Sequence, residues 1–459
     1  MAELAEVATA DLPIAGIPAQ GRWSGYQIYL ITILTLVVMC NTMDRSIMSL
    51  LQEAIKRDLS LSDEQLGLIS GPAFALFYSV AGFPVARLAE RFNRPRLVSS
   101  AIAFWSAMTA LCGLVTGFAS LATLRAAVGI GEGGANPSCH SLLADEFSVR
   151  QRGMAMSVLS SATPISKVIV PVTTGAVALI WGWRTAFVVM AIPGFILALI
   201  LWFGVREPRH TSPMPIAAGT FLTDSRWLFG NRAFVFVVLA GAFNGIGIQG
   251  TGIFTTSFLI RGHHLNIAQA GGIVSLLGLG AFIGTMLGGY LADRFADARG
   301  RSYVLVPAVG AVLSTALYTL GFRAESLPAA IVLLVAANFS SEIKNGPNLA
   351  AVQNIVPSRM RATAAAYFFF GATVIGTSLG AALVGYLSDS FARSAFSGDY
   401  ARACVAGHGA IGLGPGVNHA CATAAARGLQ AALLIIPLTF IAAAVFFWLA
   451  SRTIRVNQE

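Results

Sequence analysis

Two charged residues, Asp44 and Arg45, lie inside the first long apolar run of the chain. A charged side chain that faces lipid at the centre of a membrane helix costs about 2.5–3.5 kcal/mol, so such residues usually face a cavity or a partner. Adjacent side chains on a helix point about 100° apart. Asp44 and Arg45 are therefore expected to reach two different neighbours rather than each other.

A second charged pair, Arg125 and Glu132, is spaced seven residues apart, which places both side chains on one face of a helix. Glycines surround Glu132 and would let another helix approach closely. We expect Arg45 to pair with Glu132 in one state and to be released in another, while Asp44 is the protonatable residue. An arginine that moves near a carboxyl group links proton uptake to conformation. The alternative is a static buried network that only fixes helix packing.

Three further charged residues fall within apolar runs. Lys167 lies between Pro164 and Pro171 and is expected to attract an anionic headgroup, to pair with an acid of the first helix, or only to form a local pair. Glu342 and Lys344 are two residues apart, so on a regular helix they would not face each other. A hydrophobic wall beside these charges is expected from aromatic residues of several helices, namely Phe77, Tyr78, Phe243, Phe254 and Tyr367.

The elements that carry these residues are predicted to span a membrane. The chain has 459 residues, of which 56% are hydrophobic and 11% are charged, whereas a soluble domain carries about 25% charged residues. Apolar runs of about 20 residues recur, and in lipid each must be helical. Twelve helices are predicted, near 25–51, 65–88, 96–118, 120–147, 152–180, 184–205, 233–260, 267–292, 302–322, 328–354, 360–391 and 427–451.

The distribution of basic residues predicts the orientation. The net charge is +9, but the basic residues lie between apolar runs, which indicates membrane topology rather than nucleic-acid binding. With both termini in the cytoplasm of a cell inner (plasma) membrane, the cytoplasmic segments hold roughly twice as many Lys and Arg as the outer ones. The predicted organisation is a tail (1–24), a six-helix bundle (25–205), a cytoplasmic linker (206–231), a second bundle (232–452) with an outer loop (392–426), and a tail (453–459).

The two halves of the sequence repeat. ARLAERFNRPRL at 86–97 follows the second predicted helix, and GYLADRFADARGR at 289–301 follows the eighth. Glu132 precedes Pro137 by five residues, just as Glu342 precedes Pro347. An internal repeat of six helices is typical of secondary transporters.

These repeated motifs resemble the major facilitator superfamily, whose loop motif is G-x-L-a-D-R-x-G-R-R. The first copy has Glu90 in place of Asp, and the second is similar over Asp293 and Arg294. Within that superfamily, NTMDRSIMSLL at 41–51 and GEGGANPS at 131–138 are similar to the spinster family of lysolipid and sphingolipid transporters. The main rival is the group of organic anion–cation symporters, which share the Asn-x-x-Asp-Arg pattern.

The resemblance implies an all-α fold of twelve transmembrane helices in two six-helix bundles. It also implies that the loop motifs form gates. Glu90 is expected to cap the N-terminus of the eleventh helix, while Arg91, Arg94 and Arg96 pair with acids or lipid phosphates. Asp293 and Arg294 occupy the matching place in the second half. The alternative is that these charges only set the topology.

The expected function is secondary active transport by alternating access, coupled to protons. The expected substrate is an amphipathic lipid, such as a lysophospholipid or a sphingoid lipid, whose headgroup meets Arg45, Arg125, Lys167 or Glu132. The alternatives are a small organic anion as substrate, or a receptor or scaffold that does not transport. The chain is expected to act as a monomer among membrane lipids, without nucleic acid.

Cysteines and absent motifs complete the predictions. Cys404 and Cys421 bracket a Gly-rich outer segment and are expected to form a disulfide, whereas Cys40, Cys112 and Cys139 are expected to be free. The sequence has no P-loop, no HExxH and no GxSxG motif, so neither an ATP-driven pump nor an enzyme is expected. No cofactor and no metal site is predicted.

Overall fold

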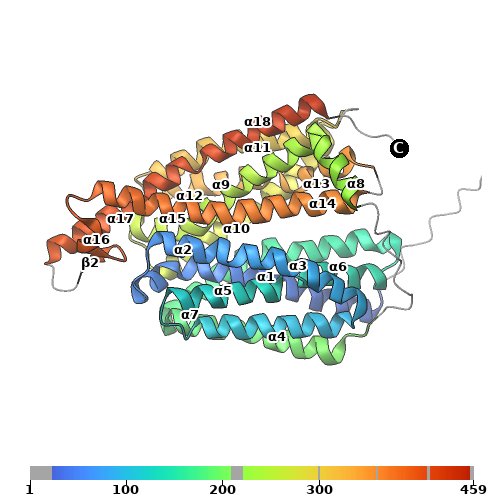
Figure 1. The fold of residues 1–459 in the computed structure, drawn as a ribbon, viewed down its shortest axis with the longest axis horizontal. Coiled ribbons are helices and arrows are strands. Elements are labelled where there is room, and N and C mark those ends of the chain that lie inside the picture. Colours follow the sequence, from blue (N-terminus) through green and yellow to red (C-terminus); the bar gives the residue numbers. More distant parts are fainter. Residues whose placement is uncertain (1–22, 208–220, 298–299, 358–359, 411–413, 455–459) are drawn as a thin grey trace, which may run out of the picture.

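The chain forms two helical bundles that lie side by side (Figure 1). The computed structural model describes residues 23–207, 221–297, 300–357, 360–410 and 414–454. The tails at 1–22 and 455–459 and residues 208–220 of the predicted linker lie outside this part. Each bundle packs its own hydrophobic core, and Ser24, Ser62 and Asn266 begin three of the helices with capping boxes.

The first bundle holds seven helical elements in chain order. These are α1 (Gly25–Asp58), α2 (Asp63–Ser70), α3 (Pro72–Arg91), α4 (Arg94–Cys112), α5 (Phe118–Glu132), α6 (Ala135–Glu146) and α7 (Val149–Gly204).

The second bundle follows a short helix, α8 (Phe221–Gly230), that lies within the predicted linker. Its elements are α9 (Arg232–His263), α10 (Ile267–Arg294), α11 (Ser302–Arg323), α12 (Leu327–Glu342), α13 (Asn345–Ile355), α14 (Arg361–Phe370), a π-helical turn η2 (Gly371–Ile375), α15 (Gly376–Ala395), α16 (Tyr400–Ala403), β1 (Cys404–Val405), β2 (His408–Gly409), α17 (Pro415–Ile435) and α18 (Leu438–Thr453).

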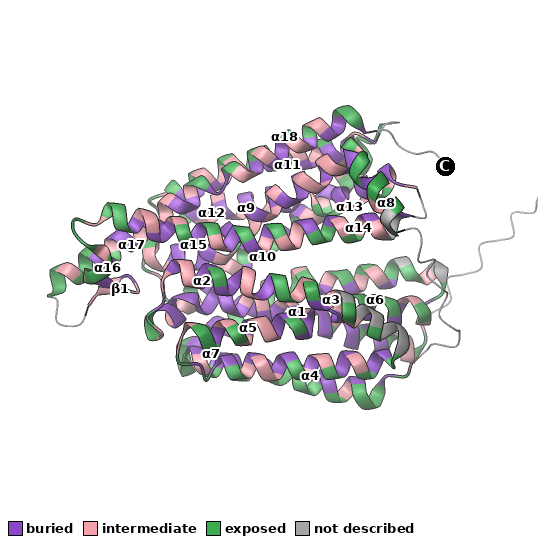
Figure 2. Ribbon diagram, viewed as in Figure 1, coloured by how far each residue is buried: buried purple, intermediate pink, exposed green. Residues whose placement is uncertain are grey.

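The helices are suited to a membrane. Nine helical segments of the described ranges are long and apolar enough to cross one, and the segment 154–204 contains two spans because Gly182 turns the chain at φ 81°. With α4 and the pair α5–α6, the arrangement agrees with twelve spans. The long helices of Figure 2 have both buried and exposed residues, and large apolar side chains such as Leu114, Phe203 and Val332 are exposed as lipid-facing groups would be.

Two predicted helices, 120–147 and 328–354, are each broken, and at matching places. The first stops at Glu132 and restarts at Ala135 as α6, while the second stops at Glu342 and restarts at Asn345 as α13. Prolines at 137 and 347 lie in the first turn of the new helix, where a missing N–H costs little. The internal repeat thus extends to the local backbone.

Other boundaries also differ from the predictions. The second predicted helix is divided at Gly71 into α2 and α3, and the eleventh contains η2. The last helix begins at Pro415 rather than near 427, so the predicted loop 392–426 is partly helical. Its remainder includes a β-hairpin in which Cys404 pairs with Gly409. We call the end of the molecule with this hairpin the hairpin end, and the end where α1 begins and α18 ends the terminal end (Figure 1).

The bundles contact each other most closely through glycines. A Cβ atom added to Gly67 of α2 would lie 2.4 Å from the Ala381 oxygen of α15, and one on Gly271 of α10 would lie 2.4 Å from the Pro171 oxygen of α7. Side chains do not fit at these distances, so the sequence allows near contact of the backbones. The seams α2–α15 and α7–α10 therefore join the two halves.

Candidate functional site: a charged cavity between the bundles

A cavity of about 320 Å³ lies between the two bundles and receives side chains from both. Helices α1, α5 and α7 line it with Arg45, Arg125 and Lys167, and α12 adds the carboxylate of Glu342, while α9 and α10 contribute mainly apolar groups. The apolar lining residues of these two helices are Ile248, Ile253, Val274, Leu277 and Ala281. The cavity thus has a cationic wall and an apolar wall, a combination suited to an amphipathic anion.

Arg45 and Glu132 form an ion pair within the cationic wall. The Arg45 Nη2 and Nε atoms both donate to Glu132 Oε2 at 3.2 Å, and Asn41 donates to the same oxygen at 3.0 Å. The Arg45 guanidinium also lies over the Tyr78 ring, 4.6 Å from its centroid. Glu132 is fully buried, whereas the Arg45 side chain is 37% exposed toward the cavity. The cation is therefore the accessible member of the pair.

Asp44 points away from this pair, as two adjacent residues of a helix must. Its side chain is buried, and among the described atoms its Oδ1 has no hydrogen-bond partner. The neighbouring Arg125, also buried, donates to the backbone oxygen of Asp44 at 3.4 Å and lies over the Phe74 ring. Asp44 is thus a buried carboxyl with one unpaired oxygen beside the Arg125 side chain.

Lys167 crosses the seam between the bundles. Its Nζ atom donates to Glu342 Oε1 at 3.0 Å, so it pairs with an acid of the twelfth helical element α12 rather than with one of α1. Lys344 also contacts Glu342, at 3.5 Å. The expectation that Glu342 and Lys344 would not face each other was wrong, because the chain leaves the α-helix between them, whereas Glu342 also has the other partner that was expected, Lys167.

The predicted aromatic wall is absent from the described lining, apart from Phe74. Phe254 is buried in the core of the second bundle, and Phe243 stacks on Phe446 with ring centroids 5.5 Å apart. Tyr367 forms a hydrogen bond with Ser225 of α8, and Phe77 is exposed. Phe243 and Phe254 thus pack within the second bundle, which is the commoner use of an aromatic residue on a membrane helix.

A dense polar network closes the hairpin end, and sequence reasoning missed it. Arg261 of α9 donates to Glu53 of α1 at 2.8 Å and to both oxygens of Asp63 at 2.7 Å, while Lys56 donates to Asp63 at 2.6 Å. No role was predicted for these four residues, which lie next to predicted helix ends. The sequence shows only that Arg261 belongs to the second half of the chain and that Glu53 and Asp63 belong to the first.

Asp389 of α15 adds a second link at the hairpin end. Its carboxylate accepts from the backbone N–H groups of Asp63 and Glu64, at 3.3 and 2.8 Å, and so caps the N-terminus of α2 from the other bundle. A capping acid between the second and eleventh spans was expected at Glu90. The side chains of Glu90 and Arg91 lie outside the described part of the chain.

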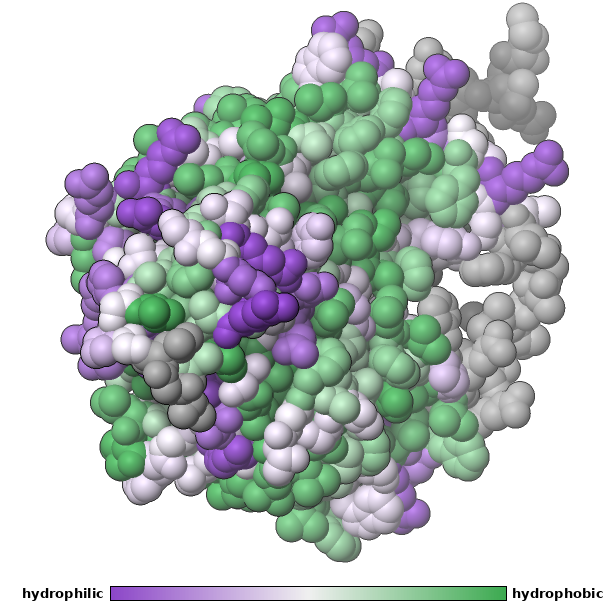
Figure 3. Space-filling model, turned by 60° about the vertical axis from the view of Figure 1, so that its left-hand side comes forward, coloured by the Kyte–Doolittle hydropathy of each residue, from purple (hydrophilic) through white to green (hydrophobic). Residues whose placement is uncertain are grey.

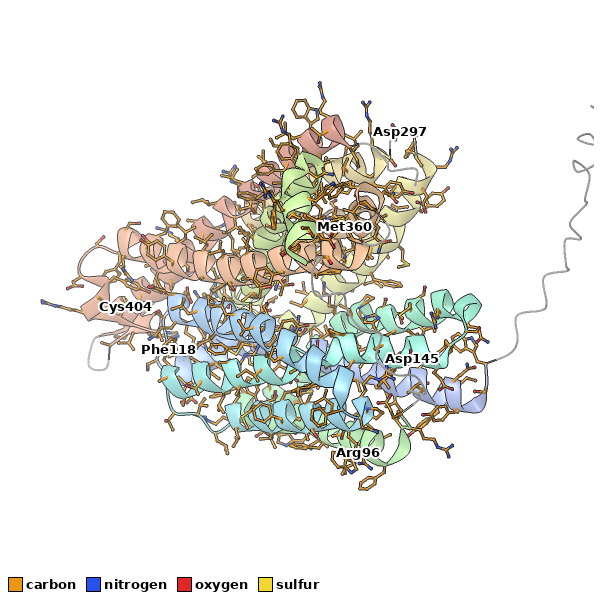
Figure 4. The ribbon with its side chains drawn as sticks, turned by 45° about the vertical axis from the view of Figure 1, so that its right-hand side comes forward. Arg96, Phe118, Asp145, Asp297, Met360 and Cys404 are labelled. Atoms are coloured by element: carbon orange, nitrogen blue, oxygen red, sulfur yellow. A yellow bond between two sulfur atoms is a disulfide. The ribbon has the colours of Figure 1, made fainter. Side chains whose placement is uncertain are left out.

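At the terminal end the predicted gating residues contact their own halves. Arg94 is buried and donates to Glu207, to Ser141 and, at 2.7 Å, to Asp145. Figure 4 labels Asp145 far from Cys404 of the hairpin end. In the second bundle, Asp293 accepts from the Tyr303 hydroxyl at 2.8 Å, and Arg294 is exposed.

Two bundles of membrane helices that enclose a charged cavity define the class of membrane transporters with two repeated halves. The family model of the Major Facilitator Superfamily matches residues 34–381, and the chain belongs to that family. It is a transporter and not an enzyme.

Several relatives support the same assignment. An efflux pump of this superfamily from Mycolicibacterium smegmatis is 32% identical over 78% of this chain and 83% of its own length. The sphingosine-1-phosphate transporter SPNS2 of Xenopus tropicalis is 27% identical, with 81% and 76% covered. The hexuronate transporter of Bacillus subtilis is also 27% identical, with 81% and 89% covered.

Among solved structures, the chain is similar to a bacterial homologue of the human lysosomal transporter Spinster in an inward-facing, unoccupied conformation. The identity is 28%, the TM-score is 0.84, and the match covers 95% of this chain and all of the other. The resemblance to the spinster family noted in the sequence is confirmed.

Proposed function

We propose that this chain is a proton-coupled secondary transporter for an amphipathic anion, with a lipid that bears an acidic headgroup as the first candidate. The observation that carries the proposal is the two-sided cavity, in which Arg45, Arg125 and Lys167 face the apolar groups of α9 and α10. Each methylene that leaves water contributes about 0.8 kcal/mol. The spinster-type relatives support a lipid.

A small organic anion is the second candidate, because the cavity is small. A volume of 320 Å³ is near the lower limit for ligand pockets and leaves little room for a long acyl chain. The similarity to a hexuronate transporter favours the same candidate. If the substrate is a lipid, its tail must pass out between α2 and α15 or between α7 and α10.

Proton coupling is assigned to Asp44. When Arg45 leaves Glu132 to contact an anionic substrate, the charge balance around the buried Asp44 changes, and the carboxyl then takes up or releases a proton. Glu132 is the partner from which the substrate displaces Arg45. The described contacts between the bundles at the hairpin end correspond to a state closed on that side.

We further propose an orientation with both termini in the cytoplasm of the inner (plasma) membrane and the hairpin outside. The chain works as a monomer, and Arg94, Asp293 and Arg294 belong to the cytoplasmic gate. A membrane-impermeant thiol reagent applied to intact cells should label a cysteine placed at Arg402 and not one placed at Asp297. The reverse pattern would overturn the orientation.

Flux into proteoliposomes tests the substrate. Lysophosphatidate, sphingosine-1-phosphate and glucuronate are compared as labelled substrates, each with and without a pH gradient. The proposal expects uptake of one of the lipids to be accelerated by the gradient. Uptake of glucuronate alone would replace the first candidate by the second, and no uptake of any of the three would favour a receptor or scaffold.

The variant Asp44→Asn tests the coupling. We expect it to lose at least about tenfold of the gradient-driven flux while retaining substrate exchange, because an amide cannot carry the proton. Asp58→Asn is the matched control, since Asp58 is on the same helix but is exposed and paired with Arg184. Gradient-driven flux of Asp44→Asn equal to that of the control would remove Asp44 from the coupling mechanism.

A further inference from the structure

A second cavity, of about 450 Å³, lies at the hairpin end and is separate from the central one. Its walls come from the end of α1 in the first bundle and from α9, α11, α17 and the hairpin in the second. Figure 3, in which this end comes forward, shows hydrophilic side chains gathered on it among hydrophobic ones. We call this cavity the hairpin pocket.

The charged residues of the hairpin pocket are mostly cations. Four arginines and four histidines line it, against two glutamates, and these residues are Arg57, Arg261, Arg323, Arg427, His263, His264, His408, His419, Glu53 and Glu325. Arg261 and Glu53 already pair with each other. Within the described ranges, no ion pair involves Arg57, Arg323 or Arg427. Three guanidinium groups are thus left against a single carboxylate.

The hairpin gives this pocket a fixed wall. A disulfide joins Cys404 to Cys421 of α17, and the turn residues Ala406 and Gly407 both have positive φ, 52° and 81°. A Cβ atom on Gly407 would lie 3.1 Å from Ala425 and 3.9 Å from the Lys56 ammonium, so the turn lies directly against both bundles. This wall of the pocket is therefore fixed by a covalent bond and is not a loose loop.

The electrostatics of the hairpin pocket also favour an anion. Burial and the nearby Arg57 guanidinium lower the pKa of His408. Cations that disfavour a further positive charge favour an anion at the same place. Guanidinium groups also match the oxygen geometry of phosphate better than any other side chain does.

We propose that the hairpin pocket binds a phosphate group, held by Arg57, Arg323 and Arg427. Because Arg57 belongs to the first bundle and the other two to the second, the bound phosphate favours the conformation in which the hairpin end is closed. The phosphate comes either from a free anion or from a lipid headgroup. The proposal concerns a site outside the central cavity and does not depend on which substrate is transported.

Thermal unfolding of the purified full chain in a neutral detergent tests binding. Inorganic phosphate should raise the unfolding temperature by a few degrees in a saturable manner, relative to chloride at equal ionic strength. Arg323→Gln combined with Arg427→Gln should abolish this shift. Arg402→Gln should retain it, because Arg402 belongs to α16, next to the hairpin, but lies outside the pocket. The central variant Glu132→Gln should retain it as well.

Two results would overturn the site: a phosphate effect no larger than that of chloride, or a shift that survives the double substitution. Lysophosphatidate below its micellar concentration identifies the source. The part of its shift that is lost with Arg323→Gln and Arg427→Gln is compared with the shift of inorganic phosphate at equal concentration. A larger value assigns the site to a lipid headgroup, and an equal or smaller one assigns it to the free anion.

A separate measurement tests whether phosphate favours closure of the hairpin end. Spin labels at Asp58→Cys and Ser326→Cys, both on the outer ends of their helices, report the distance across the hairpin end. Phosphate should enlarge the short-distance population in the wild-type background and leave it unchanged with Arg323→Gln and Arg427→Gln. An unchanged population in both backgrounds would overturn the link between phosphate binding and closure.

Discussion

At the scale of single residues, Asp44 and Arg45 divide two roles between neighbouring positions. Arg45 faces the cavity and Glu132, whereas Asp44 is buried with an unpaired oxygen beside Arg125. Helical geometry alone predicts this division, because adjacent side chains diverge by about 100°. Asn41 forms hydrogen bonds with both Arg45 and Glu132. The same geometric reasoning could have predicted this, since Asn41 precedes Arg45 by one helical turn.

Glu132→Gln is expected to weaken the site while the fold is retained. The amide keeps the hydrogen-bonding shape but leaves Arg45 without its counter-charge, at a cost of about 1–3 kcal/mol in the free energy of unfolding. Gradient-driven flux should fall at least about tenfold. A double-mutant cycle with Arg45→Gln, measured by thermal unfolding, should give a coupling energy clearly above zero. Strictly additive effects would show that the pair does not contribute as a unit.

Other residue-level predictions failed for identifiable reasons. Lys344 contacts Glu342 because the helix breaks between them, and the spacing of the two residues does not reveal this break. The aromatic residues could not be assigned to a wall, since composition does not tell which side of a helix faces the seam. Arg261 and Asp63 gave no local signal, because their importance depends on a contact between residues 198 positions apart.

At the scale of elements, the backbones of α2 and α15 approach each other closely, in addition to the Asp389 side chain of α15 that caps α2. A Cβ atom on Gly385 of α15 would lie 2.2 Å from the Asp63 oxygen, and one on Gly67 would lie 2.4 Å from the Ala381 oxygen. At these glycines no flexible side chain lies between the two backbones. We therefore expect α2 and α15 to come together or to separate as rigid helices. The seam is therefore a structural requirement for closure of the hairpin end.

Gly67→Ala should disfavour the closed hairpin end. The added methyl group meets backbone atoms that cannot rotate away, and overpacking of this kind costs about 1–3 kcal/mol. The distance across the hairpin end, measured with the spin labels described above, should shift toward longer values. Gly252→Ala in α9 is the control, because a Cβ atom there meets nothing within 4 Å. Equal distance distributions for the two variants would contradict the expected role of the seam.

The sequence predicts the existence of the spans better than their shape. Apolar length is a local property, so the membrane helices and the repeat could be read directly. The breaks after Glu132 and Glu342 were not predicted, although each is followed by a proline within five residues. A helix interrupted inside a membrane needs partners for its freed backbone groups, and those partners come from other helices.

At the scale of the whole molecule, polar links among the described residues join the bundles at two places, the central cavity and the hairpin end. Lys167 and Glu342 meet at the central cavity, while Arg261 binds Glu53 and Asp63 at the hairpin end. In the proposed alternating-access mechanism, the link at the hairpin end breaks when this side of the molecule opens. We therefore expect the hairpin-end network to act as a lock that keeps this side closed.

Arg261→Gln should release that lock. The substitution leaves Glu53 and Asp63 without their shared cation, and loss of one partner from a buried charge network costs up to about 3–5 kcal/mol. We expect a shift toward the open hairpin end, seen as longer spin-label distances and as faster labelling of a cysteine placed at Gln249 by a reagent added on the hairpin side. Arg402→Gln, whose arginine is 90% exposed, should leave both measurements unchanged.

The disulfide between Cys404 and Cys421 also bears on how the molecule is made. Both cysteines follow α15 and precede most of the final span, so they are synthesised after nearly all other membrane segments. Thiols oxidise outside the reducing cytosol, so in the proposed orientation the bond forms only after this segment has been exported. We infer that the bond marks export of this segment: in pulse-labelled cells, chains that carry it have the hairpin outside, and reduced chains have not yet exported it or are misinserted.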